Sequence, residues 1–149
     1  MEVSEVGEDD LADLLPLMAA YCAFYETAPP ADRLAALSRA LLDDPEHEGL
    51  QLIARSGDEG EAIGFATVYW TWSTTRAFRL AVMNDLFVAE AGRGAGVGRA
   101  LIEACAERAR ARGCGALEWQ TAPGNETAQR LYDTTGAERS TWVAYELSL

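Results

Sequence analysis

The stretch Leu86-Phe87-Val88-Ala89-Glu90-Ala91-Gly92-Arg93-Gly94-Ala95-Gly96-Val97-Gly98 decides the fold of this chain. Its first three residues are apolar in succession, as in a strand that is covered on both faces. Four glycines fall within residues 92–98, and an amphipathic helix that runs to about Arg112 follows them. Bare backbone N–H groups at a glycine-rich helix start can point at an anion, so the stretch predicts a pyrophosphate site.

Two nucleotide-binding motifs can be excluded for this glycine turn. The chain contains no lysine, which rules out a P-loop and also Schiff-base chemistry. The dinucleotide fingerprint Gly-x-Gly-x-x-Gly fails because Gly94-Ala95-Gly96 is followed by Val97-Gly98-Arg99. A purely structural glycine turn stays open as an alternative, since glycine-rich tight turns are common.

Periodicity outward from the turn predicts a single domain over residues 1–149. Runs rich in β-branched and aromatic residues predict strands at 2–6, 50–54, 62–71, 78–88, 116–121 and 139–147, with a hairpin turn at 57–60. Apolar residues at helical spacing predict helices at 9–25, 31–42, 97–112 and 125–135. This order predicts a mixed α/β fold, in which a mostly antiparallel sheet of six or seven strands is flanked by about four helices.

Charge is distributed unevenly along the chain, whose net charge is −12. Residues 76–112 hold seven arginines against four carboxylates, and the remainder holds five arginines against twenty carboxylates. The acidic total argues against nucleic acid as a partner, because phosphate binding needs a basic surface. The basic island suits a phosphate-bearing cofactor and the acidic surroundings suit a cationic substrate, although arginines that only solvate helix faces are an alternative.

Cysteine and histidine show no metal or disulfide pattern. Cys22, Cys105 and Cys114 lack Cys-x-x-Cys spacing, and His47, the single histidine, has no second His or Cys near it. We therefore expect free thiols in a reducing compartment and no metal. No apolar run nears the roughly 18 residues of a membrane span, and residues 1–5 show no basic region before an apolar stretch. These features predict a soluble, cytoplasmic protein with no membrane partner.

A second motif lies in register with the glycine turn. Arg93-Gly94-Ala95-Gly96-Val97-Gly98 resembles the Arg/Gln-x-x-Gly-x-Gly/Ala signature of the GCN5-related N-acetyltransferases (GNAT). Asn125-Glu126-Thr127-Ala128-Gln129-Arg130-Leu131-Tyr132 is similar to the Asn-x-x-Ala-x-x-Leu-Tyr segment of that family. The resemblance runs from about Ile63 to Leu147, and it implies the acyl-CoA N-acyltransferase fold with acetyl-CoA as co-substrate.

The resemblance also implies which residues meet acetyl-CoA. Backbone groups of residues 86–88 would hydrogen-bond the pantetheine arm as a strand edge does. Residues 93–99 would wrap the pyrophosphate, and one face of the following short helix would meet the thioester end. The expected cofactor-binding residues are Leu86, Phe87, Val88, Arg93, Gly94, Ala95, Gly96, Val97, Gly98, Arg99, Asn125, Thr127 and Ala128.

Tyr132 is the candidate catalytic residue. An amine that attacks a thioester needs hydrogen-bond donors near the carbonyl oxygen and a proton for the departing sulfur. A tyrosine, whose ordinary pKa is about 10, stays protonated at neutral pH and can donate to a thiolate whose acid has a pKa of about 8.5. On its own, a tyrosine after leucine in a helix indicates a core residue. The register with Asn125 reverses that preference.

The acceptor amine is expected at the end of the first helix, which commonly shapes the acceptor pocket in this family. Asn84-Asp85 stands where the polyamine N-acetyltransferases, the members that this chain resembles most, often have a Glu-Asp pair. The missing glutamate leaves the general base open. The candidate substrate-binding residues are Tyr21, Tyr25, Glu26, Asn84, Asp85 and Trp119, and Phe24, Tyr69, Trp70 and Trp72 add aromatic surface that is equally consistent with ordinary core.

We therefore expect an N-acetyltransferase that moves an acetyl group from acetyl-CoA to a small cationic primary amine such as a polyamine, by direct attack with Tyr132 as general acid. A protein acetyltransferase acting on lysines or N-termini is the first alternative. A non-catalytic acyl-CoA sensor is the second, but a sensor need not keep a proton donor at Tyr132. The apolar segment Trp142-Val143-Ala144-Tyr145 suggests a homodimer.

Overall fold

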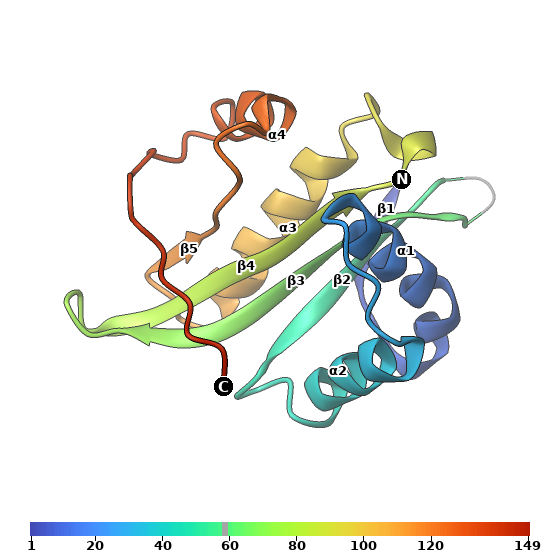
Figure 1. The fold of residues 1–149 in the computed structure, drawn as a ribbon, viewed down its shortest axis with the longest axis horizontal. Coiled ribbons are helices and arrows are strands. Elements are labelled where there is room, and N and C mark those ends of the chain that lie inside the picture. The colour runs from blue at the N-terminus through green and yellow to red at the C-terminus, as the bar shows by residue number, and fades with distance from the viewer. Residues whose placement is uncertain (58–59) are drawn as a thin grey trace.

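The computed structural model describes residues 1–57 and 60–149, which form a mixed α/β fold (Figure 1). Its strands are β1 (Glu2–Glu5), β2 (Gly49–Arg55), β3 (Ala62–Ser73), β4 (Phe78–Val88) and β5 (Ala116–Glu118). Its α-helices are α1 (Leu11–Phe24), α2 (Ala31–Asp43), α3 (Val97–Ala111) and α4 (Glu126–Tyr132). The four helices and the mostly antiparallel sheet confirm the expected architecture. No helix in the described part of the chain is both long enough and apolar enough to cross a bilayer.

The sheet follows the order of the chain, β1-β2-β3-β4-β5. The first three pairings are antiparallel, and β5 runs parallel to β4, with Leu80 opposite Ala116 and Val82 opposite Glu118. Because β5 is so short and pairs with the beginning of β4, the second half of β4 has β3 on one side and no strand on the other. The sheet is therefore open beside residues 83–88.

Two apolar clusters attach the helices to opposite faces of the sheet. On one face Leu14 of α1 packs with Phe65 of β3, and on the other Leu101 of α3 packs with Val68 of β3. Successive side chains of a strand point to opposite faces, so β3 supplies both clusters by alternation. Figure 1 shows the result, with α1 and α2 on one side of the sheet and α3 on the other.

A β-bulge interrupts the pairing of β3 with β4. Thr67 lies opposite Asp85 and Val68 lies opposite Met83, so Asn84 is the extra residue. A bulge bends its strand and redirects the side chains that follow it. Here it leaves Asn84 exposed and places Asp85 and Phe87 on the α1 face of the sheet.

The prediction of six or seven strands is wrong for the described residues, which form five. Residues 139–147 were expected to be a strand, but they run as an exposed, irregular C-terminal segment after α4 (Figure 1). A period-2 apolar pattern marks a chain that can form a strand, but a strand also needs a partner edge. The fifth strand ends at Glu118 rather than at residue 121. The predicted turn at 57–60 includes Asp58 and Glu59, which lie outside the described residues.

Candidate active site

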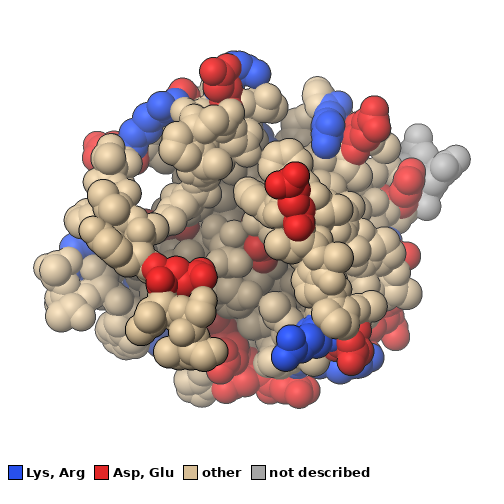
Figure 2. Space-filling model, viewed as in Figure 1, with Lys and Arg blue, Asp and Glu red and all other residues tan. Residues whose placement is uncertain are grey.

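A cavity of about 570 Å³ opens where β5 diverges from β4. Figure 2 shows a central hollow on this face, with carboxylates around it and one recessed within it. The end of α1, the second half of β4, the glycine turn and α4 surround the cavity. Most of the predicted site residues line it, namely Tyr21, Tyr25, Asn84, Leu86, Phe87, Val88, Arg93, Gly94, Gly96, Val97, Gly98, Arg99, Trp119, Asn125, Thr127, Ala128 and Tyr132.

The glycine turn forms one end of the cavity. Gly94 and Gly96 have φ values of 77° and 79°, in the left-handed region, and a Cβ built on either would meet no atom within 4 Å. The backbone is therefore open to a ligand on this side, and Gly96 immediately precedes the positive end of α3. Arg93 is exposed beside the turn and makes no ion pair within residues 1–57 and 60–149. An anionic phosphate group fits this combination.

Arg99 lies next to the turn but is already engaged. Its Nη2 donates to the carbonyl oxygen of Thr134 at 3.2 Å and to the Thr134 hydroxyl at 2.6 Å. The arginine thus ties the first turn of α3 to the end of α4. Of the two basic residues at the turn, Arg93 is the one whose charge is available to a ligand.

The α4 side of the cavity holds Tyr132. Asn125 caps this helix, since its Oδ1 accepts from the N–H of Ala128 at 3.2 Å. Seven residues later, the ring of Tyr132 packs edge-on against Trp119, with the ring centroids 5.5 Å apart. Burial raises the pKa of Tyr132, and the nearby Tyr25 raises it further. The phenol therefore stays protonated well into the basic range.

An unsatisfied polar atom also lies in the cavity wall. The Oγ1 of Thr121 is buried and has no hydrogen-bond partner among the described residues. Buried polar groups are nearly always hydrogen-bonded in native proteins. A polar ligand in the cavity would supply the missing partner. The amide groups of a pantetheine arm could hydrogen-bond to this oxygen.

Aromatic rings from α1 form the opposite end of the cavity. Tyr21 packs edge-on against Tyr25 at 5.1 Å and against Phe87 of β4 at 6.3 Å. Phe24, which directly precedes Tyr25, is an apolar side chain that is 62% exposed. A cationic amine is attracted to the faces of such rings.

Asp85 stands behind this aromatic end and not in the cavity wall. It is half-buried, and burial raises its pKa, while hydrogen bonding by Thr67, Tyr21 and Asn84 partly offsets that increase. Asn84 Nδ2 donates to Asp85 Oδ1 at 3.0 Å. The carboxylate therefore reaches the cavity only through its neighbours.

Three expected site residues do not line the cavity. They are Ala95, Glu26 and Asp85. Ala95 lies in the glycine turn with its side chain outside the cavity lining, and Glu26 follows the end of α1 with a φ of 58°, which turns the chain away. The predicted aromatic surface of β3 is also absent from the cavity: Trp70 is buried in the core, where its Nε1 donates to the carbonyl oxygen of Pro45, and Trp72 lies under Arg79.

Five cavity residues are not among the expected site residues. Met83 and Leu131 lie within the elements predicted at 78–88 and 125–135, where no residue pattern singles them out, and the β4 bulge beside Met83 has no simple sequence signal. Gln120 and Thr121 were assigned to a strand, yet their departure from β4 is what creates the opening. The missed residues are Met83, Gly92, Gln120, Thr121 and Leu131.

Comparison with known proteins identifies relatives along the whole chain. The sequence model of the acetyltransferase (GNAT) family matches residues 14–137. The uncharacterized N-acetyltransferase YhfO of Bacillus subtilis is 34% identical over 150 residues, which cover 100% of this chain and 98% of YhfO. The D-amino-acid N-acetyltransferase HPA3 of Saccharomyces cerevisiae is 35% identical over 126 residues, which cover 85% of this chain and 77% of HPA3. The structure of an aminoglycoside N-acetyltransferase in complex with CoA has a TM-score of 0.85 at 21% identity, and the match covers 99% of this chain and 93% of that one.

Proposed function

The chain belongs to the GNAT acetyltransferase family, and we propose that this acetyl-CoA-dependent N-acetyltransferase acetylates a small cationic primary amine, such as a polyamine. The observation that carries the proposal is the acceptor end of the cavity, where tyrosine rings stand in front of a half-buried carboxylate. Both features attract a cation, and the chain has a net charge of −12. We also infer that residues 1–149 act as a single catalytic domain.

Acetyl-CoA would lie along the cavity from the glycine turn toward α4. We assign the pyrophosphate to the backbone of residues 93–99, Ala95 included, with Arg93 as its charged partner. We assign the pantetheine arm to the free edge of residues 86–88, because a strand edge without a neighbouring strand keeps backbone groups available for a ligand. Asn125, Thr127 and Ala128 would then contact the thioester end from the first turn of α4.

Tyr132 is the proposed general acid. It is the last residue of α4 and lines the cavity, and its raised pKa keeps the phenolic proton in place at neutral pH. When the amine displaces the thiol, Tyr132 donates that proton to the departing sulfur. Trp119 holds the ring of Tyr132 in position by edge-on packing.

The acceptor amine would bind between the aromatic end of α1 and the bulge of β4. Tyr21, Tyr25 and Trp119 would contact its carbon chain and its charge, and Asn84 would accept or donate a hydrogen bond at the bulge. Asp85 and Glu26 would act on the amine as negative charges from outside the wall. Asp85 is half-buried, where charge is screened less than in water, so its effect reaches the amine, whereas the exposed Glu26 adds only to the negative charge of the rim.

A free amino acid is a second candidate acceptor. The relative HPA3 is named a D-amino-acid N-acetyltransferase, and its similarity covers 85% of this chain. An amino acid carries a carboxylate, which needs a cationic partner near the acceptor end. Among the described residues, the cations of the cavity wall are Arg93 and Arg99, both near the glycine turn. Arg130 lines an adjoining hollow beside Phe24 and Tyr25, but it is paired with Glu126 at 3.7 Å. The charge of the acceptor end therefore favours the amine.

Acetyl-CoA turnover measured with a thiol-trapping dye tests the proposal directly. The panel comprises spermidine, simple diamines, L- and D-amino acids, an aminoglycoside and a lysine-containing peptide. We expect diamines or spermidine to give the highest kcat/KM, and Tyr132→Phe to lower turnover with every acceptor. Amino acids that outperform the diamines would overturn the assignment of the acceptor.

We further propose that the enzyme is a homodimer. The C-terminal segment, residues 140–149, is exposed throughout and makes no hydrogen bond to the rest of the described chain. Trp142, Tyr145 and Leu147 are 84%, 93% and 83% exposed. Covering the large apolar side chains of this segment would remove roughly 800 Å² per copy, the usual contribution of one partner to a stable interface. A second copy of the chain is the proposed cover.

A further inference from the structure

A series of side chains connects the cavity to Asp85, and Tyr132, the proposed general acid, is not one of them. Asp85 lies opposite Thr67 across the β3 and β4 pairing, directly after the bulged residue Asn84. The Thr67 hydroxyl is itself held by Gln51, whose Nε2 donates to it at 3.2 Å. A hydroxyl that accepts from Gln51 keeps its own hydrogen for a second partner, and the Asp85 carboxylate is the acceptor that lies opposite it. The carboxylate is thus fixed from behind.

Tyr21 is the element of this chain that reaches the cavity. Its ring is wedged edge-on between Phe65, at 5.8 Å, and Tyr25, at 5.1 Å, and it lines the cavity wall. The ring also contacts Phe87 at 6.3 Å, and Phe87 follows Asp85 by two residues on the same face of β4, which brings Tyr21 beside the Asp85 carboxylate. Burial raises the pKa of Tyr21, and the Asp85 charge raises it further. The phenol is therefore a donor that stays protonated beside a buried acceptor.

Among the described residues, no cation forms an ion pair with Asp85. The titratable groups that face it are Tyr21 from α1 and Tyr69 from β3, and the pKa of both is raised in part by its charge. None of the ion pairs formed within residues 1–57 and 60–149 includes Asp85. A half-buried carboxylate without a counter-ion holds a proton more readily than an exposed one. It is suited to receive a proton from a cationic ligand.

An acetyltransferase needs such an acceptor. A primary amine is an ammonium ion at neutral pH, with an ordinary pKa near 10, and it cannot attack until it loses a proton. We propose, building on the proposed function, that the acceptor ammonium passes this proton through the Tyr21 hydroxyl to Asp85. Tyr21 is then a catalytic residue, because it touches the substrate, and Asp85 is a positioning residue that acts through it.

The protons balance in this scheme. An N–H bond of the ammonium breaks as the Tyr21 oxygen gains that hydrogen, and Tyr21 gives its own phenolic hydrogen to an Asp85 oxygen. Tyr21 ends unchanged, Asp85 ends neutral and the amine is free to form the C–N bond. The nitrogen then loses a second hydrogen, which replaces the one that Tyr132 gives to the sulfur. Asp85 returns its proton to solvent, so one proton is released per turnover.

The test compares pH profiles of kcat and kcat/KM for wild type, Asp85→Asn, Tyr21→Phe and the double variant. We use the amine that wild type turns over best. Both single variants should lose about 100-fold or more in kcat at pH 7, the usual size of acid-base effects, and recover toward pH 10, where the amine deprotonates by itself. The double variant should be no slower than either single one, since each change breaks the same relay.

Tyr69→Phe is the matched control, because Tyr69 also faces Asp85 but does not line the cavity. It should keep the wild-type pH profile of kcat.

A loss of kcat that is equal at every pH, or a double variant in which the two losses multiply, would overturn the relay. Thermal melts and acetyl-CoA binding check the fold, and Tyr21→Phe alone decides if Asp85→Asn does not fold. If wild type acetylates an amine but the variants keep its pH profile, only the relay is wrong. If wild type acetylates none, the proposed function itself is wrong.

Discussion

At the scale of single residues, Gly96 determines whether the glycine turn can approach a phosphate. Its φ of 79° costs an alanine about 1–2 kcal/mol, yet a Cβ there would meet no protein atom. We therefore expect Gly96→Ala to fold with modestly lower stability and to raise the KM for acetyl-CoA about tenfold, with a smaller change in kcat. Steady-state kinetics and thermal melts measure the two effects.

Gly113→Ala is the control for this prediction. Gly113 has a φ of 71° with the same open space around it, but it follows the far end of α3. It should lose similar stability and keep the KM of wild type. An equal rise in KM for both variants would show that the turn acts through general stability and not through the ligand.

The pKa of Tyr132 leads to a prediction at the same scale. Because burial raises this pKa above its ordinary value of 10, the phenol is protonated at pH 9, and wild type should not lose the acid function there. Tyr132→Phe should lower kcat about 100-fold at pH 7. The deficit should shrink above pH 8.5, where the thiol departs as a thiolate without a proton. A deficit that is constant from pH 7 to pH 10 would assign Tyr132 a packing role beside Trp119.

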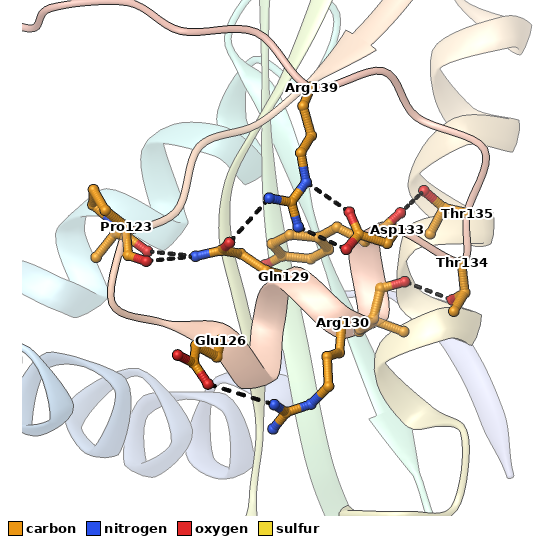
Figure 3. Close-up of polar contacts among 11 residues, drawn as sticks. Pro123, Glu126, Gln129, Arg130, Asp133, Thr134, Thr135 and Arg139 are labelled. Carbon is orange, nitrogen blue, oxygen red and sulfur yellow. Dashed lines mark hydrogen bonds and ion pairs between the residues drawn. The ribbon is translucent and has the colours of Figure 1, made fainter.

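At the scale of elements, α4 is a seven-residue helix that depends on side-chain tethers (Figure 3). At its start, Gln129 Nε2 donates to the carbonyl oxygen of Pro123 at 2.8 Å. At its end, Arg139 forms a two-pronged pair with Asp133 at 2.8 and 2.6 Å and also donates to Gln129 Oε1 at 3.2 Å. A helix this short is marginal without tertiary contacts.

We expect Arg139→Gln to lower kcat two- to fivefold with little change in the melting temperature, because Tyr132 precedes the tethered Asp133. The Arg139 guanidinium lowers the pKa of Asp133 below its ordinary value of 3.8, so the tether is present above pH 4 and is lost as the pH falls through the lowered pKa. Arg39→Gln, which removes an exposed ion pair between Arg39 of α2 and Glu8, should leave kcat unchanged. A drop in melting temperature with unchanged kcat would contradict this role.

The elements also show what a sequence can and cannot predict. The helices α1, α2 and α3 follow from apolar spacing, and their observed ends lie within two residues of expectation. The glycine turn and α4 could also be predicted, because the residue types at each of them favour one backbone geometry. The bulge at Asn84 and the early end of β5 depend on how two strands diverge, which no local pattern encodes. The cavity, and the position of Asp85 behind Tyr21, could only come from the structure.

At the scale of the whole molecule, the C-terminal segment stands apart, because it is exposed and makes no hydrogen bond to the rest of the described chain. Its apolar residues Val143, Tyr145 and Leu147 recur at every second position, so they would share one side if the segment were extended, and period 2 is typical of a half-buried strand. Exposed apolar surface of this extent is typical of an interface. The proposed dimer accounts for both the pattern and the exposure.

Replacing Tyr145 and Leu147 by serine should convert a dimer to a monomer in sedimentation or light scattering, while wild type remains a dimer at micromolar concentration. The same result for a variant changed at Ser140 and Ser148 would point to chain flexibility and not to apolar burial.

The net charge decides the salt dependence of the dimer. Each copy carries −12, so the two copies repel one another. Added salt screens this repulsion and should strengthen the dimer, whereas an interface held by ion pairs would weaken. A wild-type monomer at all salt concentrations would refute the dimer and leave the assignment of the active site intact.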